Sequence, residues 1–416
     1  MHKTPSASNR KSCPYCFIIP PHILQRLATS GDPALATTAG RTLRLTQSLA
    51  AFRAQLSTGA LSPAAARRTG LKRQVFDCQG SSDLPGDLIR SEGGSPSRDK
   101  AVNEAYDNAG TTWDFYNKIF GRESVDDHGK ALVSSVHYGE DYDNAFWDTR
   151  QMVYGDGDRV LFQRFTSALD VVAHELTHGV TQFTAQLAYQ DQQGALNESM
   201  SDVFGSMVKQ WALGQTVDEA DWLIGAAIMA PGFQGRALRD MANPGTAYDD
   251  QRLGKDPQPG HMRDYVQTDS DNGGVHINSG IPNRAFVLAA KAIGGKSWDT
   301  AGKIWYHTLT ERLTGTADFA KCATETVSVA RDLFPQDATI AAKVAKAWAD
   351  VGVLEETSPA AALANVSSVY VIAPRLREVA AAVALPAKKK KPSPKKAAAK
   401  SSRRAPKKKF RSSGGR

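Results

Sequence analysis

Apolar residues in the middle of the chain recur at the spacing of buried helices. The segment TSALDVVAHELTHGVTQFTA is apolar on nearly every side, and a helix with that pattern is normally enclosed by protein. Helical spacing also occurs in GIPNRAFVLAAKAIG and in TIAAKVAKAWADVGV. We therefore expect residues 195–353 to be mostly helical.

The part of the chain before the buried helix has a mixed pattern. SRDKAVNEAYDNAGTTWDFYNKIFG predicts a helix with Ser97 as N-cap and Gly121 at its end. ALVSSVHYG predicts a β-strand, and SSDLPGDLIRSEGGSP is rich in turn-forming residues. Strands and turns are thus expected there beside a single long helix.

The first 72 residues have a pattern of their own. PPHILQRLATSG predicts a short helix that begins at Pro21 and ends at Gly31. Residues 36–72 are rich in Ala, Thr, Arg and Ser, and STGALSPAAARRTG within them predicts an exposed linker.

Composition places most of the chain among globular proteins. The 416 residues are 41% hydrophobic and 23% charged, which is enough for two domains and additional segments. We expect no transmembrane helix, because no apolar run reaches about 18 residues. Pro20, Pro21 and His22 interrupt the first apolar stretch, which makes it a poor secretory signal. Two locations stay open, secretion without a recognisable signal peptide and the cytoplasm.

The net charge of +8 is concentrated at the C-terminal end. Fourteen of the 51 Lys and Arg residues lie after Pro386 with no acid among them, so the remainder has 37 basic and 43 acidic residues. Residues 356–416 are Ala- and Lys-rich, which predicts a disordered basic tail. Its charge suits a polyanion such as nucleic acid or anionic lipid, although Phe410 alone offers no platform for base stacking. The alternative is a nonspecific solubilising tail.

The buried helix contains the motif H-E-x-x-H, formed by His174, Glu175 and His178. Residues four apart lie on one helix face, so both imidazoles point the same way, as two ligands of one metal ion require. Glu175 lies beside them and can act on a water molecule without being a ligand. Core helices rarely bury two histidines and a glutamate without a functional reason.

The segment GALNESMSDVFG supplies candidates for the rest of a metal site. Glu198 is the expected third ligand, and Asp202, one turn further, is placed to accept the second ring N–H of a zinc-bound histidine. Two histidines and one glutamate leave a fourth position for water, which is typical of catalytic zinc. A structural zinc site would use closed, usually Cys-rich ligation.

Four blocks of sequence occur in the order found in one known family. They are NAFWDTRQMVYGDGD, VVAHELTHGVTQFTAQLAYQDQQGALNESMSDVFG, LRDMANP and DNGGVHINSGIPNRAF. Over about residues 75–354 the chain resembles the thermolysin family of zinc metalloendopeptidases. The resemblance implies an α+β, two-lobe fold, with a β-rich N-terminal lobe (71–190), a helical C-terminal lobe (191–355) and the zinc helix between them. We expect a monomer.

The same resemblance implies a role for each site residue. Glu175 would be the general base that activates water at the zinc and later protonates the leaving amine. Tyr189 and His276 would stabilise the oxyanion, with Asp271 orienting His276. Residues that would bind the peptide or orient the zinc histidines are Arg239, Asn144, the backbone of Ala145, Asn197 and Asp202.

A pocket after the cleaved bond is implied for Phe162, Phe165, Val171 and Leu238. Such a lining favours cleavage on the N-terminal side of a large apolar residue, Leu or Phe. The alternative is that these four are ordinary core residues.

The chain departs from the family at the two calcium ions expected beside the zinc helix. The corresponding positions are Asp170, Lys209, Asp221, Leu223 and Ala226. Calcium needs several oxygen ligands, usually charged ones, so this double site is largely lost. We hypothesise that the Lys209 ammonium replaces the calcium charge and pairs with Asp170 or Asp221.

Residues 1–70 resemble the short propeptide and linker of the protealysin-type branch of that family. FIIPPHIL would then cover the cleft of a zymogen until self-cleavage in the linker, for example at Ala60–Leu61. The alternative is a disordered leader. Cys13 and Cys16 form C-x-x-C without the context of a redox motif. Either thiol could bind the catalytic zinc, or both could be plain packing or surface residues.

These observations predict a zinc-dependent endopeptidase that is made as a latent, secreted precursor and acts on peptide or protein substrates. The alternative is a polyanion- or nucleic-acid-binding protein whose protease body is incidental. The general base Glu175 and the three ligands are all present, which favours the enzyme.

Overall fold

The computed structural model describes residues 16–55 and 70–355. The predictions for Cys13, for Ala60–Leu61 and for the tail 356–416 lie outside these residues. No helix of the described ranges combines the length and apolarity needed to cross a membrane.

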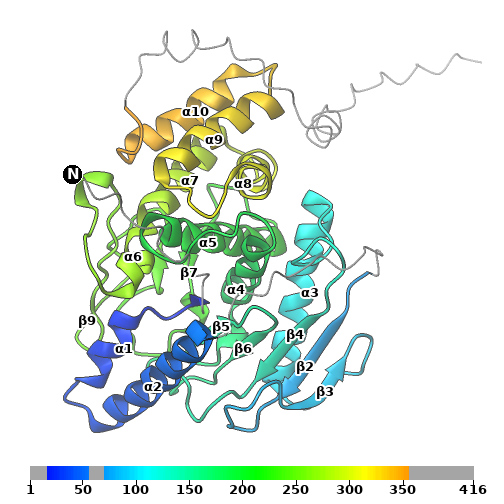
Figure 1. The fold of residues 1–416 in the computed structure, drawn as a ribbon, viewed down its shortest axis with the longest axis vertical. Coiled ribbons are helices and arrows are strands. Elements are labelled where there is room, and N and C mark those ends of the chain that lie inside the picture. The colour runs from blue at the N-terminus through cyan, green and yellow to red at the C-terminus, as the bar shows by residue number, and fades with distance from the viewer. Residues whose placement is uncertain (1–15, 56–69, 356–416) are drawn as a thin grey trace, which may run out of the picture.

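A six-stranded sheet forms the N-terminal lobe, in the order β1-β5-β6-β4-β2-β3 (Figure 1). β4 pairs in parallel with β2 and β6, whereas β1–β5, β5–β6 and β2–β3 are antiparallel. The strands are β1 (Cys16–Phe17), β2 (Arg73–Asp77), β3 (Asp87–Ser91), β4 (Leu132–Val136), β5 (Ala145–Trp147) and β6 (Met152–Tyr154). The strand predicted from ALVSSVHYG is therefore confirmed as β4.

The long helix of this lobe is α3 (Lys100–Phe120), which packs against β2 and β4. Gly121 ends it in the left-handed conformation, with φ of 67°, as expected for a helix C-terminus. The predicted N-cap, Ser97, is wrong. The Asp99 side chain accepts the first free amides of the helix, and the Ser97 hydroxyl instead accepts the amide of Asp99 at 3.1 Å.

Two buried helices cross the centre of the molecule between the sheet and the C-terminal helices (Figure 1). They are α4 (Leu169–Gln182) and α5 (Asp191–Leu213), and α4 is buried at every position from Asp170 to Thr181. Gly205 lets them approach closely, because a Cβ there would lie 2.6 Å from the carbonyl oxygen of Asp170. The prediction of an enclosed helix is confirmed.

The C-terminal helices are α6 (Asp271–Asn278), α7 (Gly280–Ile293), α8 (Ala301–His307), α9 (Phe319–Leu333) and α10 (Ala338–Asp350). With the sheet lobe they confirm the two-lobe α+β fold. Residues 214–270 were wrongly predicted as mostly helical. They contain the short strands β7 (Leu223–Ile224), β8 (Arg239–Asp240), β9 (Asp249–Asp250) and β10 (Gly254–Lys255), because Gly, Pro and Asp interrupt helical hydrogen bonding there.

The N-terminal segment forms two helices, α1 (Pro21–Ala28) and α2 (Pro33–Gln55), which lie against the catalytic body (Figure 1). The sequence analysis predicted no helix over residues 36–55, and the linker that it predicted from STGALSPAAARRTG lies, apart from Gly70, outside the described residues. The Ala-rich sequence has high helix propensity, and the Asp32 carboxylate caps the first turn through the amides of Ala34 and Leu35. Thr42 is buried where its hydroxyl accepts the amide of Asp143.

His137 joins the start of α3 to the loop after β6. Its Nε2 lies 2.7 Å from Asp99 and its Nδ1 lies 2.8 Å from Asp156. The hydrogen bond to Asp156 and the charges of both carboxylates raise the pKa of His137 to about 9, although burial opposes this. The protonated ring therefore stabilises the fold fully below pH 6.5, and this contribution is lost as pH rises through 9.

We predict that His137→Gln removes about 1–2 kcal/mol of pH-dependent stability, because the folded state no longer binds an extra proton. The measurement is chemical unfolding of the full-length Glu175→Ala chain at pH 6.5, 8 and 10. His128→Gln is the matched control, since the His128 ring meets a backbone carbonyl at Asp126. An unchanged pH slope in His137→Gln would contradict the prediction.

Candidate active site

The three predicted ligands converge from α4 and α5. His174 Nε2 lies 3.1 Å from His178 Nε2 and 3.4 Å from Glu198 Oε2, and His178 Nε2 lies 3.5 Å from Glu198 Oε1. Tetrahedral zinc with bonds of about 2.0–2.1 Å holds its ligand atoms about 3.3 Å apart. Glu198 Oε2 is buried without a hydrogen-bond partner among the described residues. The donor set therefore fits one zinc ion.

Hydrogen bonds at their Nδ1 atoms fix the orientation of both imidazoles. His174 Nδ1 lies 2.8 Å from Asp202 Oδ1, and His178 Nδ1 lies 2.9 Å from Asn197 Oδ1. These contacts place both predicted partners of the zinc histidines. Ser201 lies 3.1 Å from His178 Nδ1 as well, and the sequence analysis missed it, although it follows Asn197 by one helical turn.

Asp202 is itself held by two further elements. Arg239 donates from Nε and Nη2 to its two oxygens, each at 2.8 Å, and Asn283 Nδ2 donates to Oδ2 at 2.8 Å. Burial alone would raise the pKa of Asp202, but Arg239 and His174 lower it to about 2. Asn283 was missed because it comes from α7 and carries no local signal.

Glu175 is fully buried beside the ligands. Its Oε2 accepts the amide of Trp147 at 3.0 Å, and Oε1 has no partner among the described residues. Burial raises the pKa of Glu175 well above its ordinary value. One oxygen is thus anchored to β5 while the other remains available to handle a proton.

Tyr189, His276 and Asp271 form a chain of polar contacts on the other side of Glu198. The Tyr189 hydroxyl donates to Glu198 and lies 3.2 Å from His276 Nε2, while His276 Nδ1 lies 2.6 Å from Asp271. Burial would lower the pKa of His276, but the carboxylates of Asp271 and Glu198 raise it to about 9. The structure therefore brings together the three residues expected at the oxyanion.

The chain's own N-terminal segment lies across this site. β1 pairs antiparallel with β5, and the amide of Ile18 donates to Ala145 O at 3.1 Å. Asn144 accepts the amide of Ile19 at 2.9 Å and donates to its carbonyl at 3.4 Å.

The carbonyls of this segment are bound from the opposite lobe. Arg239 Nη1 donates to Ile18 O at 3.2 Å, and His276 Nε2 lies 2.7 Å from Phe17 O. Asn144, Ala145, Arg239 and His276, which were all expected to bind substrate, thus contact successive residues of one extended segment.

His22 completes the contact and was not singled out from the sequence. The residue is half-buried, but both ring nitrogens are buried, and neither has a hydrogen-bond partner among the described residues. The charged groups that influence it are Asp271 and His276 of α6 and Arg239 of β8. Burial lowers the pKa of His22 to about 4, so the ring is neutral in the docked segment at pH 7.

The four expected pocket residues, Phe162, Phe165, Val171 and Leu238, are all buried. They belong to the same apolar cluster as Ile18 and Ile19 of the N-terminal segment. Because the rest of the protein core belongs to it too, their role in substrate binding stays a prediction.

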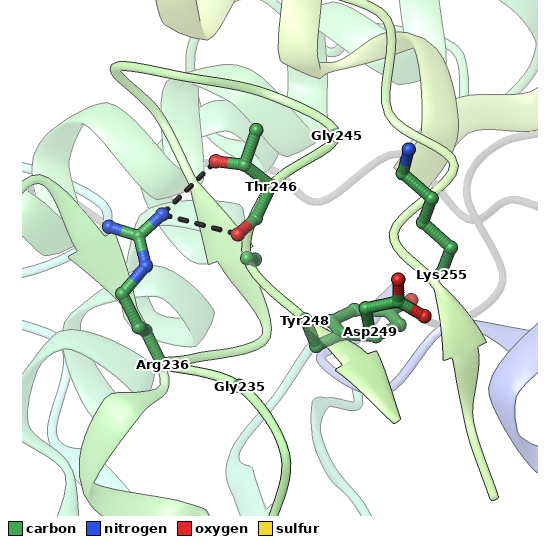
Figure 2. Close-up of a pocket in the computed structure, with 8 residues that line it drawn as sticks. Gly235, Arg236, Gly245, Thr246, Tyr248, Asp249 and Lys255 are labelled. Atoms are coloured by element: carbon green, nitrogen blue, oxygen red, sulfur yellow. Dashed lines mark hydrogen bonds between the residues drawn. The ribbon is translucent and has the colours of Figure 1, made fainter. Parts of the chain in front are cut away.

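A separate hollow of about 280 Å³ lies in the loop region 235–255 (Figure 2). Arg236 bonds there to the hydroxyl and the backbone oxygen of Thr246. None of the expected catalytic or zinc-binding residues lines it.

Lys209 occupies the place where calcium was expected. Its Nζ lies 3.3 Å from Asp170, 2.9 Å from Asp221 and 2.8 Å from the carbonyl oxygen of Leu223. Burial would lower the pKa of Lys209, but the two carboxylates raise it. The ammonium therefore neutralises Asp170, as hypothesised from the sequence, and pairs with Asp221 as well.

Comparison with known proteins finds matches over most of the chain. Residues 43–182 match the family model described as thermolysin metallopeptidase, catalytic domain, and residues 185–353 match the one described as its alpha-helical domain. An extracellular metalloprotease of Pectobacterium carotovorum subsp. carotovorum is 52% identical over 345 residues, which are 82% of this chain and 98% of that protein. Protease PrtS of a Photorhabdus strain is 44% identical over 345 residues, 92% of its length.

A solved structure is similar as well. It is described as the precursor of protealysin, a metalloproteinase from Serratia proteamaculans, with a TM-score of 0.74 and 50% sequence identity. The match covers 82% of this chain and all of that one.

We predict that Lys209→Met lowers the free energy of unfolding by about 3 kcal/mol, because it leaves the buried Asp170 carboxylate without a cation. Lys209→Glu should also be destabilised, and added calcium should partly restore its stability. Thermal unfolding with calcium or with a calcium-selective chelator tests both, and the exposed Lys291→Met is the control. A large, saturable calcium stabilisation of the wild-type chain would overturn the account of Lys209.

Proposed function

This chain belongs to the thermolysin family of metallopeptidases, and from that premise we propose that it is a zinc endopeptidase made as a latent precursor, its cleft covered by residues 16–28. Metalloendopeptidase activity follows from the family. The observation that carries the proposal is the run of contacts from Ala145, Asn144, Arg239 and His276 to the backbone of residues 17–19.

His174, His178 and Glu198 would hold the zinc, which when bound polarises a peptide carbonyl and acidifies water. Glu175 removes the proton of the attacking water and returns it to the leaving nitrogen. Its fixed Oε2, bonded to the amide of Trp147, leaves Oε1 for this transfer.

His276 and Tyr189 donate to the carbonyl oxygen as it gains negative charge. Phe17 O, which accepts from His276, stands for that oxygen in the precursor. Asp271 fixes the orientation of His276 and balances its charge. Arg239 binds the next carbonyl, represented by Ile18 O, and keeps the peptide extended along β5.

The contacts of the segment also support the proposed cleavage preference. Ile18 directly follows the carbonyl bound by His276, so it stands where the residue after the cut would lie. Its side chain is fully buried in apolar surroundings. A substrate with Leu or Phe at that position would bury comparable apolar area, worth about 1.5–3 kcal/mol.

The proposed location is outside the cell. The Pectobacterium relative is described as extracellular, and we propose the same for this chain. The cytoplasm is the alternative. We also propose a monomer.

The basic tail supports a second, separate function, the binding of a polyanion. Fourteen Lys and Arg residues after Pro386, with no acid among them, would bind through released counterions, so affinity should fall steeply with salt. Polyanion binding by the tail would not require the catalytic residues. The chain nevertheless retains all of them. The protease is therefore the better supported function.

We predict that the processed enzyme cleaves peptides before Leu or Phe. Glu175→Ala should lower kcat/KM by roughly 10²–10⁴-fold, because proton transfer is lost. Zinc content, measured by atomic emission, should stay at one ion per chain. The surface variant Glu219→Ala is the matched control. Retained cleavage in zinc-loaded Glu175→Ala would exclude the proposed mechanism.

Docking of the N-terminal segment should weaken in acid. The released His22 has its ordinary pKa of 6.5, and the docked ring has a pKa of about 4. Docking is therefore strongest above pH 6.5 and weakens as pH falls toward 4, by up to roughly 10²-fold, because only the released ring takes a proton.

Hydrogen exchange of the amides of Ile18 and Ile19 measures this docking in the Glu175→Ala precursor at pH 7 and pH 5, after correction for intrinsic rates. His22→Gln is the control that cannot be protonated, and it should lose the excess opening at pH 5. Equal acid sensitivity in both chains would rule out His22 as the cause.

A further inference from the structure

Cys16 lies directly beside the zinc-binding residues. Its Sγ, a ring nitrogen of His178 and a carboxylate oxygen of Glu198 all lie within 4.8 Å of one another. The side chain is 3% exposed and packs with Tyr189 and Val275. A thiol from the N-terminal segment is therefore buried against two of the three ligands that belong to the catalytic body.

The backbone beside Cys16 lies as a substrate would. The carbonyls of Phe17 and Ile18 accept from His276 and Arg239, and the amide of Ile18 donates to Ala145. The Phe17–Ile18 bond thus stands where a bond would be cut. A peptide bond held in this way stays uncut only if the attacking water is excluded.

The pairing of β1 with β5 puts Cys16 beside the strand that holds the general base. Cys16 lies opposite Trp147, and the amide of Trp147 anchors the general base Glu175. The thiol therefore lies on the strand that pairs with the one holding the general base, within 4.8 Å of ligand atoms of His178 and Glu198. Glu198 Oε2 and Glu175 Oε1 both lack hydrogen-bond partners among the described residues.

We propose that Cys16 Sγ is the fourth zinc ligand of the precursor and takes the coordination position that water takes in the processed enzyme. The inference rests on the proposed function and deepens it. On ligation the thiol releases its proton to solvent, a zinc–sulfur bond forms and the water leaves. The closed set of two histidines, one glutamate and one thiolate is typical of a structural site, so the Phe17–Ile18 bond stays intact.

Cobalt substitution tests the sulfur ligand directly, without any measure of activity. The full-length Glu175→Ala precursor, which cannot process itself, is loaded with cobalt(II), and its absorption spectrum is recorded. We expect a thiolate-to-cobalt charge-transfer band in the near ultraviolet. Cys16→Ser should lose this band, while Cys13→Ser and Cys78→Ser, which remove other thiols, should retain it.

The proposal is overturned if the Cys16→Ser precursor keeps the band, or if the Glu175→Ala precursor lacks it while binding one cobalt ion. Metal content and circular dichroism of each variant show whether it is loaded and folded. Should Cys16→Ser fold poorly, alkylation gives a second readout on the unchanged thiol. Zinc should protect Cys16 from iodoacetamide and a chelator should expose it, and equal alkylation would count against the ligand.

Failure of this inference can be told apart from failure of the proposed function. If the processed enzyme cleaves peptides but the precursor shows no sulfur ligand, only the Cys16 ligand is wrong. If the processed, zinc-loaded chain cleaves no peptide, the proposed function is wrong whatever the spectrum shows.

Discussion

The Asp202 carboxylate is the point where four elements of the chain meet. From α5 it binds His174 of α4, Arg239 of β8 and Asn283 of α7. A buried charge is costly unless every lone pair is satisfied, and here each oxygen receives two hydrogen bonds or ion-pair contacts. This network couples the orientation of the His174 imidazole, proposed to bind zinc, to the position of the Arg239 guanidinium, proposed to bind the peptide.

The buried carboxylate of Asp170, on α4, is neutralised in a different way. Lys209 places an ammonium between Asp170 and Asp221, and its position depends on a side chain rather than on an ion from solution. A covalently attached cation is present at every calcium concentration, whereas a calcium ion stabilises only in proportion to its occupancy. The stability of this region is thereby a property of the sequence itself.

Local periodicity made most of the zinc site predictable. His174, Glu175 and His178 share one helix, and Glu198 and Asp202 share the next, so helical spacing places each set on one helix face. The roles of Tyr189, His276 and Arg239 came only from the family resemblance, since these residues lie on three separate parts of the chain. Asn283 and His22 were missed because their partners lie far away in the sequence. Helix α2 was not predicted because its sequence has no strong amphipathic pattern, and burial of Thr42 and Leu35 against the body stabilises it.

Helix α2 has a consequence for how the proposed inhibition by residues 16–28 would end. It anchors the inhibitory segment to the body through contacts such as Arg41 with Glu140 and Thr46 with Tyr142. While the chain is continuous, the segment competes with substrate at a fixed effective concentration, on the order of millimolar for a short tether. After a single cut in the connection to the body, the concentration of the segment around the site would instead depend on how far the protein is diluted. The cut segment would then stay bound through these contacts at high protein concentration and dissociate at low concentration.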